Sequence, residues 1–129
     1  MDKKKILVVE DNPTNMELFM ILFEGEGYII HKAINGKEGL DKAVSEQFDL
    51  IVLDPGLPDF KGKEILKALR DIPTLEHCII VICSANVSRD SQKELLASGG
   101  NHFIGKPIDT ALFLSDIARL LKKPGASPS

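Results

Sequence analysis

Short apolar segments alternate with segments of helical periodicity along the sequence, and this alternation limits the fold more than any other feature. Strands that alternate with helices form βαβ units, whose strands are parallel and whose crossovers are right-handed. The sequence therefore predicts an α/β fold, a three-layer α/β/α sandwich around a five-stranded parallel sheet. The expected strands are residues 6–9, 28–34, 48–53, 78–83 and 102–105, and the expected helices are 13–24, 36–47, about 65–72, 89–97 and about 114–121.

Length and composition suit one domain and exclude several classes of protein. The chain has 129 residues, with 19 acidic and 16 basic side chains and a net charge of −3. We expect one domain over residues 1–122 and a disordered polar tail over residues 123–129. The mild acidity argues against nucleic acid as a partner. No apolar run approaches the ~18 residues of a membrane span, so no membrane partner is expected either.

The N-terminal region and the cysteines indicate a cytoplasmic protein. The apolar run at residues 6–9 is too short for a signal peptide, which needs about 7–15 apolar residues. Cys78 and Cys83 fall in one predicted strand, on opposite faces and about 16 Å apart. A disulfide needs Cα atoms within about 7 Å, so the two cysteines are expected to be buried thiols.

Chemically active side chains follow four of the five predicted strands. Glu10 and Asp11 follow the first strand, Asp54 the third, Ser84 the fourth and Lys106 the fifth. Taken singly, each also fits a structural role, as a helix cap, a strand end or a solvated charge. The carboxyl ends of parallel strands meet at one edge of the sheet, so we expect these five side chains to form one site.

The residue types at this edge favour phosphoryl chemistry with a metal ion. Three neighbouring carboxylates repel one another unless a proton or a cation intervenes. Oxygen ligands suit Mg²⁺ rather than zinc, which prefers histidine and cysteine, and we assign His31, His77 and His102 structural roles. A Mg²⁺ ion beside a lysine and a hydroxyl group is typical of a phosphoryl site, in which Asp54 can be the nucleophile.

Motifs spread over residues 4–122 carry a resemblance to a known family. They are Glu10-Asp11-Asn12 after an apolar run, Asp54-x-x-Leu57-Pro58-x-x-x-Gly62, Ser84-Ala85 and Gly99-x-x-x-Phe103-x-x-Lys106-Pro107. The spacings of 30 residues from Asp54 to Ser84 and of 22 from Ser84 to Lys106 agree with them. In these features the chain resembles the receiver domain of two-component response regulators.

The resemblance implies a sheet order, a metal site and a phosphoacceptor. The strand order would be 2-1-3-4-5, as in flavodoxin-like folds. Mg²⁺ would be held by Glu10, Asp11, Asp54 and the backbone carbonyl of Gly56. Asp54 would take a phosphoryl group from a histidine kinase or a phosphotransfer protein. The chain would then be a regulatory protein rather than an enzyme.

The resemblance also assigns roles around the acceptor. Lys106 would pair with the acceptor carboxylate and the phosphoryl oxygens, and its peptide bond to Pro107 would be cis. Ser84 would hydrogen-bond the phosphoryl group. The backbone at Gly56 and Ala85 would also bind it.

Phe103 would act as a rotameric switch. Its movement would change the surface formed by the fourth helix, the fifth strand and the fifth helix. A downstream protein target would bind that surface, and the protein would be a monomer or a weak dimer.

Four residues depart from the family pattern. Pro55 directly follows the acceptor and has no N–H to donate, and Gly56 adds flexibility beside it. Lys61 stands where an acid is common and adds a positive charge, while Gly100 stands where alanine is usual. We expect Pro55 and Gly56 to affect the rate and lifetime of phosphorylation rather than its occurrence.

Several alternatives remain open at this level. One is a receiver-like module that signals by binding without phosphorylation, although all five key positions are filled. Another is a receiver taken from a hybrid kinase or a larger regulator. A flavodoxin-type binder of flavin or nucleotide would need a phosphate-binding loop where the acidic residues 10 and 11 stand. A Mg²⁺ phosphatase with an aspartyl-phosphate intermediate would need an acid in place of Gly56.

Overall fold

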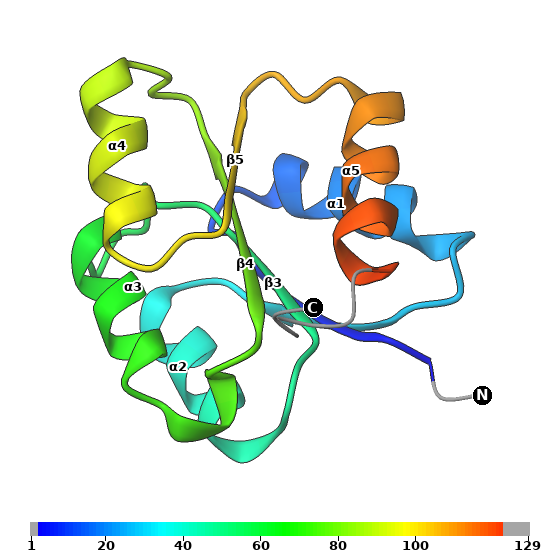
Figure 1. Cartoon of the computed structure of the whole chain (residues 1–129). Helices are drawn as coiled ribbons and strands as arrows, with labels where there is room; N and C mark the ends of the chain where they lie inside the picture. The colour runs from blue at the N-terminus through cyan, green and yellow to red at the C-terminus, as the bar shows by residue number, and fades with distance from the viewer. Residues whose placement is uncertain (1–2, 123–129) are drawn as a thin grey trace.

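The computed structural model describes residues 3–122, in which five strands alternate with five α-helices (Figure 1). The predicted tail, residues 123–129, lies outside the described residues. In chain order the elements are β1 (Lys5–Val9), α1 (Pro13–Glu24), β2 (Ile29–Ala33), α2 (Gly36–Ser45), β3 (Leu50–Leu53), α3 (Gly62–Arg70), the short 3-10 helix η1 (Pro73–Leu75), β4 (Ile79–Ser84), α4 (Arg89–Ala97), β5 (His102–Gly105) and α5 (Thr110–Lys122).

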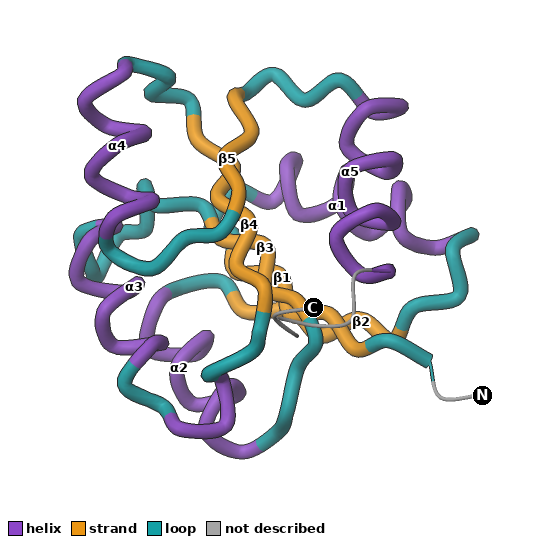
Figure 2. The backbone as a smooth tube through the Cα atoms, viewed as in Figure 1, coloured by secondary structure: helices purple, strands orange, loops and turns teal. Residues whose placement is uncertain are grey.

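The strands form one parallel sheet in the order β2-β1-β3-β4-β5, which confirms the predicted architecture (Figure 2). The central strands β3 and β4 are buried at every position. They are nearly continuous apolar runs because helices cover both faces of the sheet, so both sets of alternating side chains are buried. The edge strand β2, in contrast, carries the exposed residues Ile29 and Lys32.

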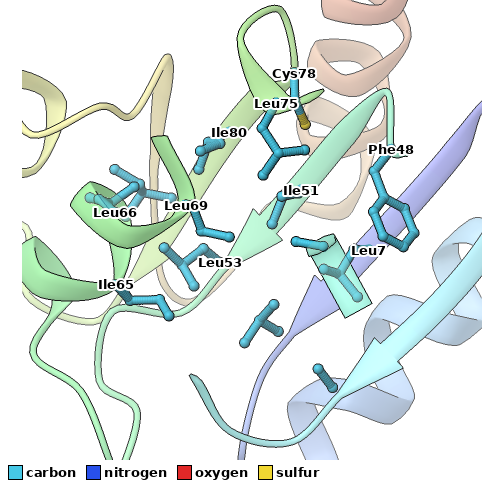
Figure 3. Packing of buried hydrophobic residues seen from close by; sticks show 14 of the residues in the cluster. Leu7, Phe48, Ile51, Leu53, Ile65, Leu66, Leu69, Leu75, Cys78 and Ile80 are labelled. Carbon is cyan, nitrogen blue, oxygen red and sulfur yellow. The ribbon is translucent and has the colours of Figure 1, made fainter. Parts of the chain in front are cut away.

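Helices on the two faces of the sheet enclose two apolar cores. On one face α2, α3 and α4 pack on the sheet, and Figure 3 shows Leu66 and Leu69 of α3 beside Ile51 and Leu53 of β3. On the other face α1 and α5 pack through aromatic side chains. The ring centroids of Phe19 and Phe23 lie 5.4 and 5.5 Å from that of Phe113. The two cores complete the three-layer sandwich.

Two strands are shorter than the apolar runs that predicted them. Tyr28 and Phe48 lie outside β2 and β3, yet each packs against one of the cores. The ring of Phe48, for example, lies 5.4 Å from that of His31. Apolar residues in a sequence indicate burial, whereas the bounds of a strand are set by hydrogen bonds to the neighbouring strand. An apolar run can therefore extend beyond the ends of the strand it predicts.

Two helices also end earlier than predicted. α2 ends at Ser45 rather than at residue 47, and α3 ends at Arg70 rather than near residue 72. Pro73 begins the unpredicted η1, and it disfavours helical backbone at the preceding residue, Ile72. Ile72 still packs against the first core, which explains why it fits the helical pattern in the sequence.

The two cysteines are free, buried and on opposite faces of the sheet, as predicted. Burial raises the pKa of both Cys78 and Cys83 to about 12, so neither supplies a reactive thiolate at neutral pH. Among the helices of residues 3–122, none combines the length and the apolar character needed to cross a bilayer.

Arg70, the last residue of α3, fixes the turn between α4 and β5. Its guanidinium donates to the carbonyl oxygens of Gly99, Leu75 and Cys78 at 2.8–2.9 Å and to Oδ1 of Asn101 at 2.6 Å. Gly99 has a φ of +133°, and a Cβ there would lie 2.8 Å from Cγ of Arg70. One side chain therefore joins α3 to η1 and to the residues that lead into β4 and β5.

Replacing Arg70 by methionine tests this role. Arg70→Met keeps an unbranched apolar stem but leaves several half-buried acceptors without a donor. We expect the free energy of unfolding to fall by about 2–3 kcal/mol, measured by urea denaturation. The control Lys67→Met changes an exposed lysine in the same helical turn and should have little effect. An Arg70→Met protein as stable as the wild type would contradict the assignment.

Candidate functional site

The carboxyl ends of the strands bring the predicted residues to one edge of the sheet. Parallel pairing continues one residue beyond β3 and β5. The N–H of Asp54 donates to the carbonyl of Val9 at 3.0 Å, and that of Lys106 donates to the carbonyl of Ser84 at 2.9 Å. Glu10, which follows Val9 directly, is thereby placed beside Asp54. The backbone of the sheet, rather than any loop, sets these positions.

Three carboxylates meet at this edge. Glu10, Asp11 and Asp54 each offer an oxygen within 4.8 Å of the other two. Glu10 is only 1% exposed, Asp54 is partly buried and Asp11 is exposed. Each ionised pair at this separation repels by about 3 kcal/mol at an effective dielectric constant of about 20. The cluster needs positive charge to stay ionised.

Lys106 supplies part of that charge from the end of β5. Its Nζ lies 2.8 Å from Oε1 of Glu10 and 3.3 Å from Oδ2 of Asp54. Burial on its own would lower the pKa of Lys106, but the hydrogen bond to Glu10 and the charges of both acids outweigh it and raise this pKa. Lys106 is therefore a permanent cation between two of the three carboxylates.

The acids still exceed the bases at this site. Burial raises the pKa of Glu10, and the neighbouring Asp54 raises it further, while Lys106 and the N–H of Asn12 act in the opposite direction. Three carboxylates against one ammonium group leave two negative charges unbalanced when all are ionised. This charge and an all-oxygen ligand set fit Mg²⁺.

A cleft of about 600 Å³ opens over Asp54. The N–H of Gly56 donates to Oδ1 of Asp54 at 2.8 Å. The hydroxyl of Ser84 accepts the N–H of Asn86 at 3.1 Å and lies 3.4 Å from the carbonyl oxygen of the same residue. The lining residues include Asp11, Asn12, Asp54, Ser84, Ala85 and Lys106. All the predicted acidic, basic and hydroxyl groups therefore lie at or directly beneath one opening.

Asn86 is the residue bonded to Ser84 that sequence reasoning missed, and Pro13 and Asn15 also line the cleft without having been predicted there. Asn86 lines the opening, its backbone bonds the hydroxyl of Ser84, and its side chain accepts the N–H of Ser88 at 3.1 Å. An asparagine in a loop before a helix is ordinarily a turn residue. No spacing or charge in the sequence distinguishes it from one.

Other predicted residues lie near the cleft without entering it. Phe103 is half-buried on β5 and packs against the core on the α4 side. The peptide bond between Lys106 and Pro107 is cis. Lys61 precedes α3 and lines an adjoining hollow, which shares Gly56, Ser84 and Asn86 with the cleft. Its position adds positive charge to the surroundings of the cleft rather than to the carboxylate cluster.

The histidines stand apart from the carboxylate cluster. Nδ1 of His31 lies 3.3 Å from Glu46, and Nε2 of His102 lies 3.4 Å from Asp116. His77 lies between η1 and β4 and lines a pocket with residues 3–5, ahead of β1 and at its start. The metal-ligand set proposed from the sequence therefore gains no nitrogen donor from these three side chains.

Two departures from the family pattern have steric counterparts. A Cβ at Gly100 would collide with Cδ1 of Ile82. Glycine in place of the usual alanine therefore leaves room for this isoleucine of β4. A Cβ at Gly62 would lie 2.7 Å from Cβ of Pro55 and 2.9 Å from Cδ2 of Leu95. The ring of Pro55 therefore occupies space that the first residue of α3 leaves open.

Comparison with known proteins agrees with this geometry. The profile of the response regulator receiver domain matches residues 6–118. The chain belongs to the response regulator receiver family. This receiver is 35% identical over 118 residues to the polar-differentiation response regulator DivK of Brucella anthropi, across 92% of this chain and 96% of that protein.

Solved structures show the same fold. A CheY-like receiver domain protein from Methanospirillum hungatei JF-1 has a TM-score of 0.86 at 28% identity, covering 93% of this chain and 94% of that chain. The chemotaxis response regulator CheY4 of Vibrio cholerae has a TM-score of 0.86 at 26% identity, covering 92% and 98% of the two chains. The family is regulatory and acts in two-component signalling with kinases or phosphotransfer proteins.

The charge imbalance of the cluster predicts stabilisation of this receiver by Mg²⁺. At a free Mg²⁺ concentration tenfold above the dissociation constant, the free energy of unfolding should rise by about 1.4 kcal/mol. Asp11→Asn removes an exposed carboxylate that is expected to bind Mg²⁺, without opening a core, so it should reduce this gain severalfold. Urea unfolding with Mg²⁺ and with a chelator measures both.

The control for this experiment is Asp71→Asn, which neutralises an exposed carboxylate at the end of α3. It should keep the full gain in stability. If Asp11→Asn gained as much stability from Mg²⁺ as Asp71→Asn, Asp11 would not be a ligand.

Proposed function

We propose that this receiver is a phosphoryl-accepting switch and that Asp54 is the acceptor. The observation that carries the proposal is the setting of this carboxylate. Its Oδ2 lies 3.3 Å from Nζ of Lys106, its Oδ1 accepts the N–H of Gly56 at 2.8 Å, and the cleft opens over it. A carboxylate held in this way is paired with a cation, oriented and accessible to a donor, as a nucleophile must be.

In the proposed reaction a carboxylate oxygen of Asp54 attacks the phosphorus of a phosphohistidine. The donor is a histidine kinase or a phosphotransfer protein. A bond between oxygen and phosphorus forms as the bond between phosphorus and the histidine nitrogen breaks, and the electron pair returns to the histidine. Lys106 balances the charge that develops on the phosphoryl oxygens, because its ammonium group already lies beside Asp54.

The proposed Mg²⁺ ligands are Glu10, Asp11, Asp54 and the backbone carbonyl of Gly56. Glu10 and Asp54 are held by the sheet and by Lys106, whereas Asp11 is exposed and Gly56 belongs to a loop. When bound, the ion screens the negative charges of the acceptor and of the phosphoryl group.

The proposed output begins at Ser84. Its hydroxyl exchanges its contacts with the backbone of Asn86 for the phosphoryl group, to which Gly56 and Ala85 also offer N–H groups. The β4–α4 loop then moves toward Asp54, and Phe103 responds because it packs on the α4 side of β5. The surface of α4, β5 and α5 changes, and a downstream protein target binds there.

We also propose a domain extent, a cellular compartment and an oligomeric state for this receiver. Residues 1–122 act as one receiver unit, in the cytoplasm and as a monomer or a weak dimer, without nucleic acid or membrane as partners. The buried free thiols and the net charge of −3 support this setting. A module that binds partners without phosphorylation is the alternative, and labelling separates the two.

A small acyl phosphate with Mg²⁺ should add one phosphoryl group to the wild type, detected by intact mass. Asp54→Asn should abolish the addition, because an amide is not a nucleophile at neutral pH. The control Asp71→Asn should be labelled like the wild type. Equal labelling of Asp54→Asn would remove Asp54 as the acceptor, and a folded wild type that takes no label would favour the binding-only module.

Pro55→Met should shorten the lifetime of the phosphorylated state. Proline fixes φ beside the acceptor, and its ring packs against Gly62, so the substitution loosens the segment that carries Gly56. We expect the half-life to fall roughly two- to fivefold. Decay of the label after removal of the donor measures it, with Pro58→Met, at an exposed proline of the same loop, as the control. An unchanged half-life would show that the proline does not act on this step.

A further inference from the structure

The loop between β3 and α3 is attached to the N-terminus of α2 through Asp59. Oδ1 of Asp59 accepts the N–H of Gly36 at 2.8 Å, and Oδ2 accepts the N–H of Lys37 at 2.9 Å. These are the first two N–H groups of α2, which lie 23 and 22 positions earlier in the chain. Both oxygens of one carboxylate are therefore used on a helix to which the residue does not belong.

α2 does not need Asp59 in order to begin. Asn35 is its N-cap and accepts the N–H of Glu38 at 2.8 Å, while Glu38 accepts the N–H of Ile34 at 3.0 Å. This reciprocal arrangement resembles a capping box and is local in sequence. What Asp59 adds is a connection between the helix and the loop, strengthened by the positive end of the helix dipole.

Phe60 reinforces the same connection. A Cβ at Gly36 would collide with Cδ2 of Phe60, so the ring lies directly against the first residue of α2. Phe60 also packs against the core on that face of the sheet. The loop is thus seated on α2 by one aromatic ring and one carboxylate at adjacent positions.

Gly56 lies three residues before Asp59 and has no side chain of its own to fix it. It is exposed, and its N–H bonds Oδ1 of Asp54. On one side of it, Pro55 packs against Gly62. On the other side, the chain is held by the buried Leu57, which is 8% exposed, and then by Asp59. These flanking attachments limit the positions that the backbone of Gly56 can take.

We infer that Asp59 is a positioning residue for Mg²⁺: by attaching the loop to α2, it holds the carbonyl of Gly56 toward the carboxylate cluster. This inference rests on the proposed function, which makes that carbonyl a ligand. Partners that hydrogen-bond metal ligands directly commonly contribute 10–100-fold to affinity, and Asp59, which acts on Gly56 only through the loop, should fall at the lower end of this range. Asp59 itself does not touch the metal or the acceptor.

Mg²⁺ binding to the full chain tests the inference. Isothermal titration calorimetry on the unphosphorylated protein should show roughly tenfold weaker binding for Asp59→Ala. Asp59→Asn keeps one acceptor oxygen and should weaken binding by an intermediate factor. In labelling reactions, the Mg²⁺ concentration for half-maximal rate should rise by the same factors. The rate at saturating Mg²⁺ should stay within about twofold of wild type, because the acceptor and Lys106 are intact.

The matched control is Asp41→Asn. Asp41 is an exposed carboxylate of α2 that pairs with Nζ of Lys37 at 3.0 Å, so the variant removes the same charge from the same helix without touching the loop. Its Mg²⁺ affinity should equal that of the wild type. Hydrogen exchange of the Gly36 and Lys37 amides should accelerate in the Asp59 variants only, and urea unfolding checks that each variant is folded.

Two results would overturn the inference. One is unchanged Mg²⁺ affinity in a folded Asp59 variant whose Gly36 and Lys37 amides exchange faster, since the connection would then be broken without effect on the metal. The other is a loss of labelling rate at saturating Mg²⁺ with unchanged affinity. Failure of the proposed function looks different: the wild type binds Mg²⁺ but takes no label at Asp54, while the effect of Asp59 on affinity remains.

Discussion

The structure depends on holding three carboxylates together against their mutual repulsion. No local segment could do this, because Glu10 and Asp54 come from different strands and Lys106 from a third. The parallel sheet sets their backbone positions, and the two apolar cores on its faces hold the sheet rigid. Part of the free energy gained by burying the two cores therefore offsets the repulsion among the carboxylates, which persists until a cation balances their charge. Such local conflict with stability is typical of functional sites.

Most of the fold and the composition of the site could be predicted from sequence because both follow from strand ends. The apolar runs located all five strands, and the residues that follow them formed the acidic cluster and its lysine. The ends of β2 and β3 could not be predicted, since Tyr28 and Phe48 pack in the cores without joining the ladder. Arg70 and Asp59 were missed for another reason. Their partners lie on other elements, and a charged residue at a helix end or in a loop has no pattern that reveals such contacts.

Two departures from the family pattern, Gly100 and Pro55, are accommodated by close packing between elements, and other glycines show the same kind of packing. Gly100 leaves the volume that Ile82 fills, and Gly62 leaves the space that the ring of Pro55 occupies. At the end of β5 a Cβ on Gly105 would lie 2.6 Å from Cγ1 of Val87, a residue of the β4–α4 loop. In each case a small residue on one element gives room to a larger side chain on another. Close packing transmits such changes between positions distant in sequence.

The two loops beside Asp54 are attached very differently, and this difference gives the proposed switch its direction. The β3–α3 loop is fixed to α2 by Asp59 and to the start of α3 by Pro55. In the β4–α4 loop Ala85, Asn86 and Val87 are exposed, and within residues 3–122 the hydroxyl of Ser84 bonds only the backbone of Asn86, in the same loop. In the proposed switch, a phosphoryl group on Asp54 would therefore meet one loop that is attached to two helices and one loop that is bonded mainly to itself. Because Arg70 holds the chain just after the end of α4, the proposed switch would concentrate the displacement of the β4–α4 loop at the beginning of that helix.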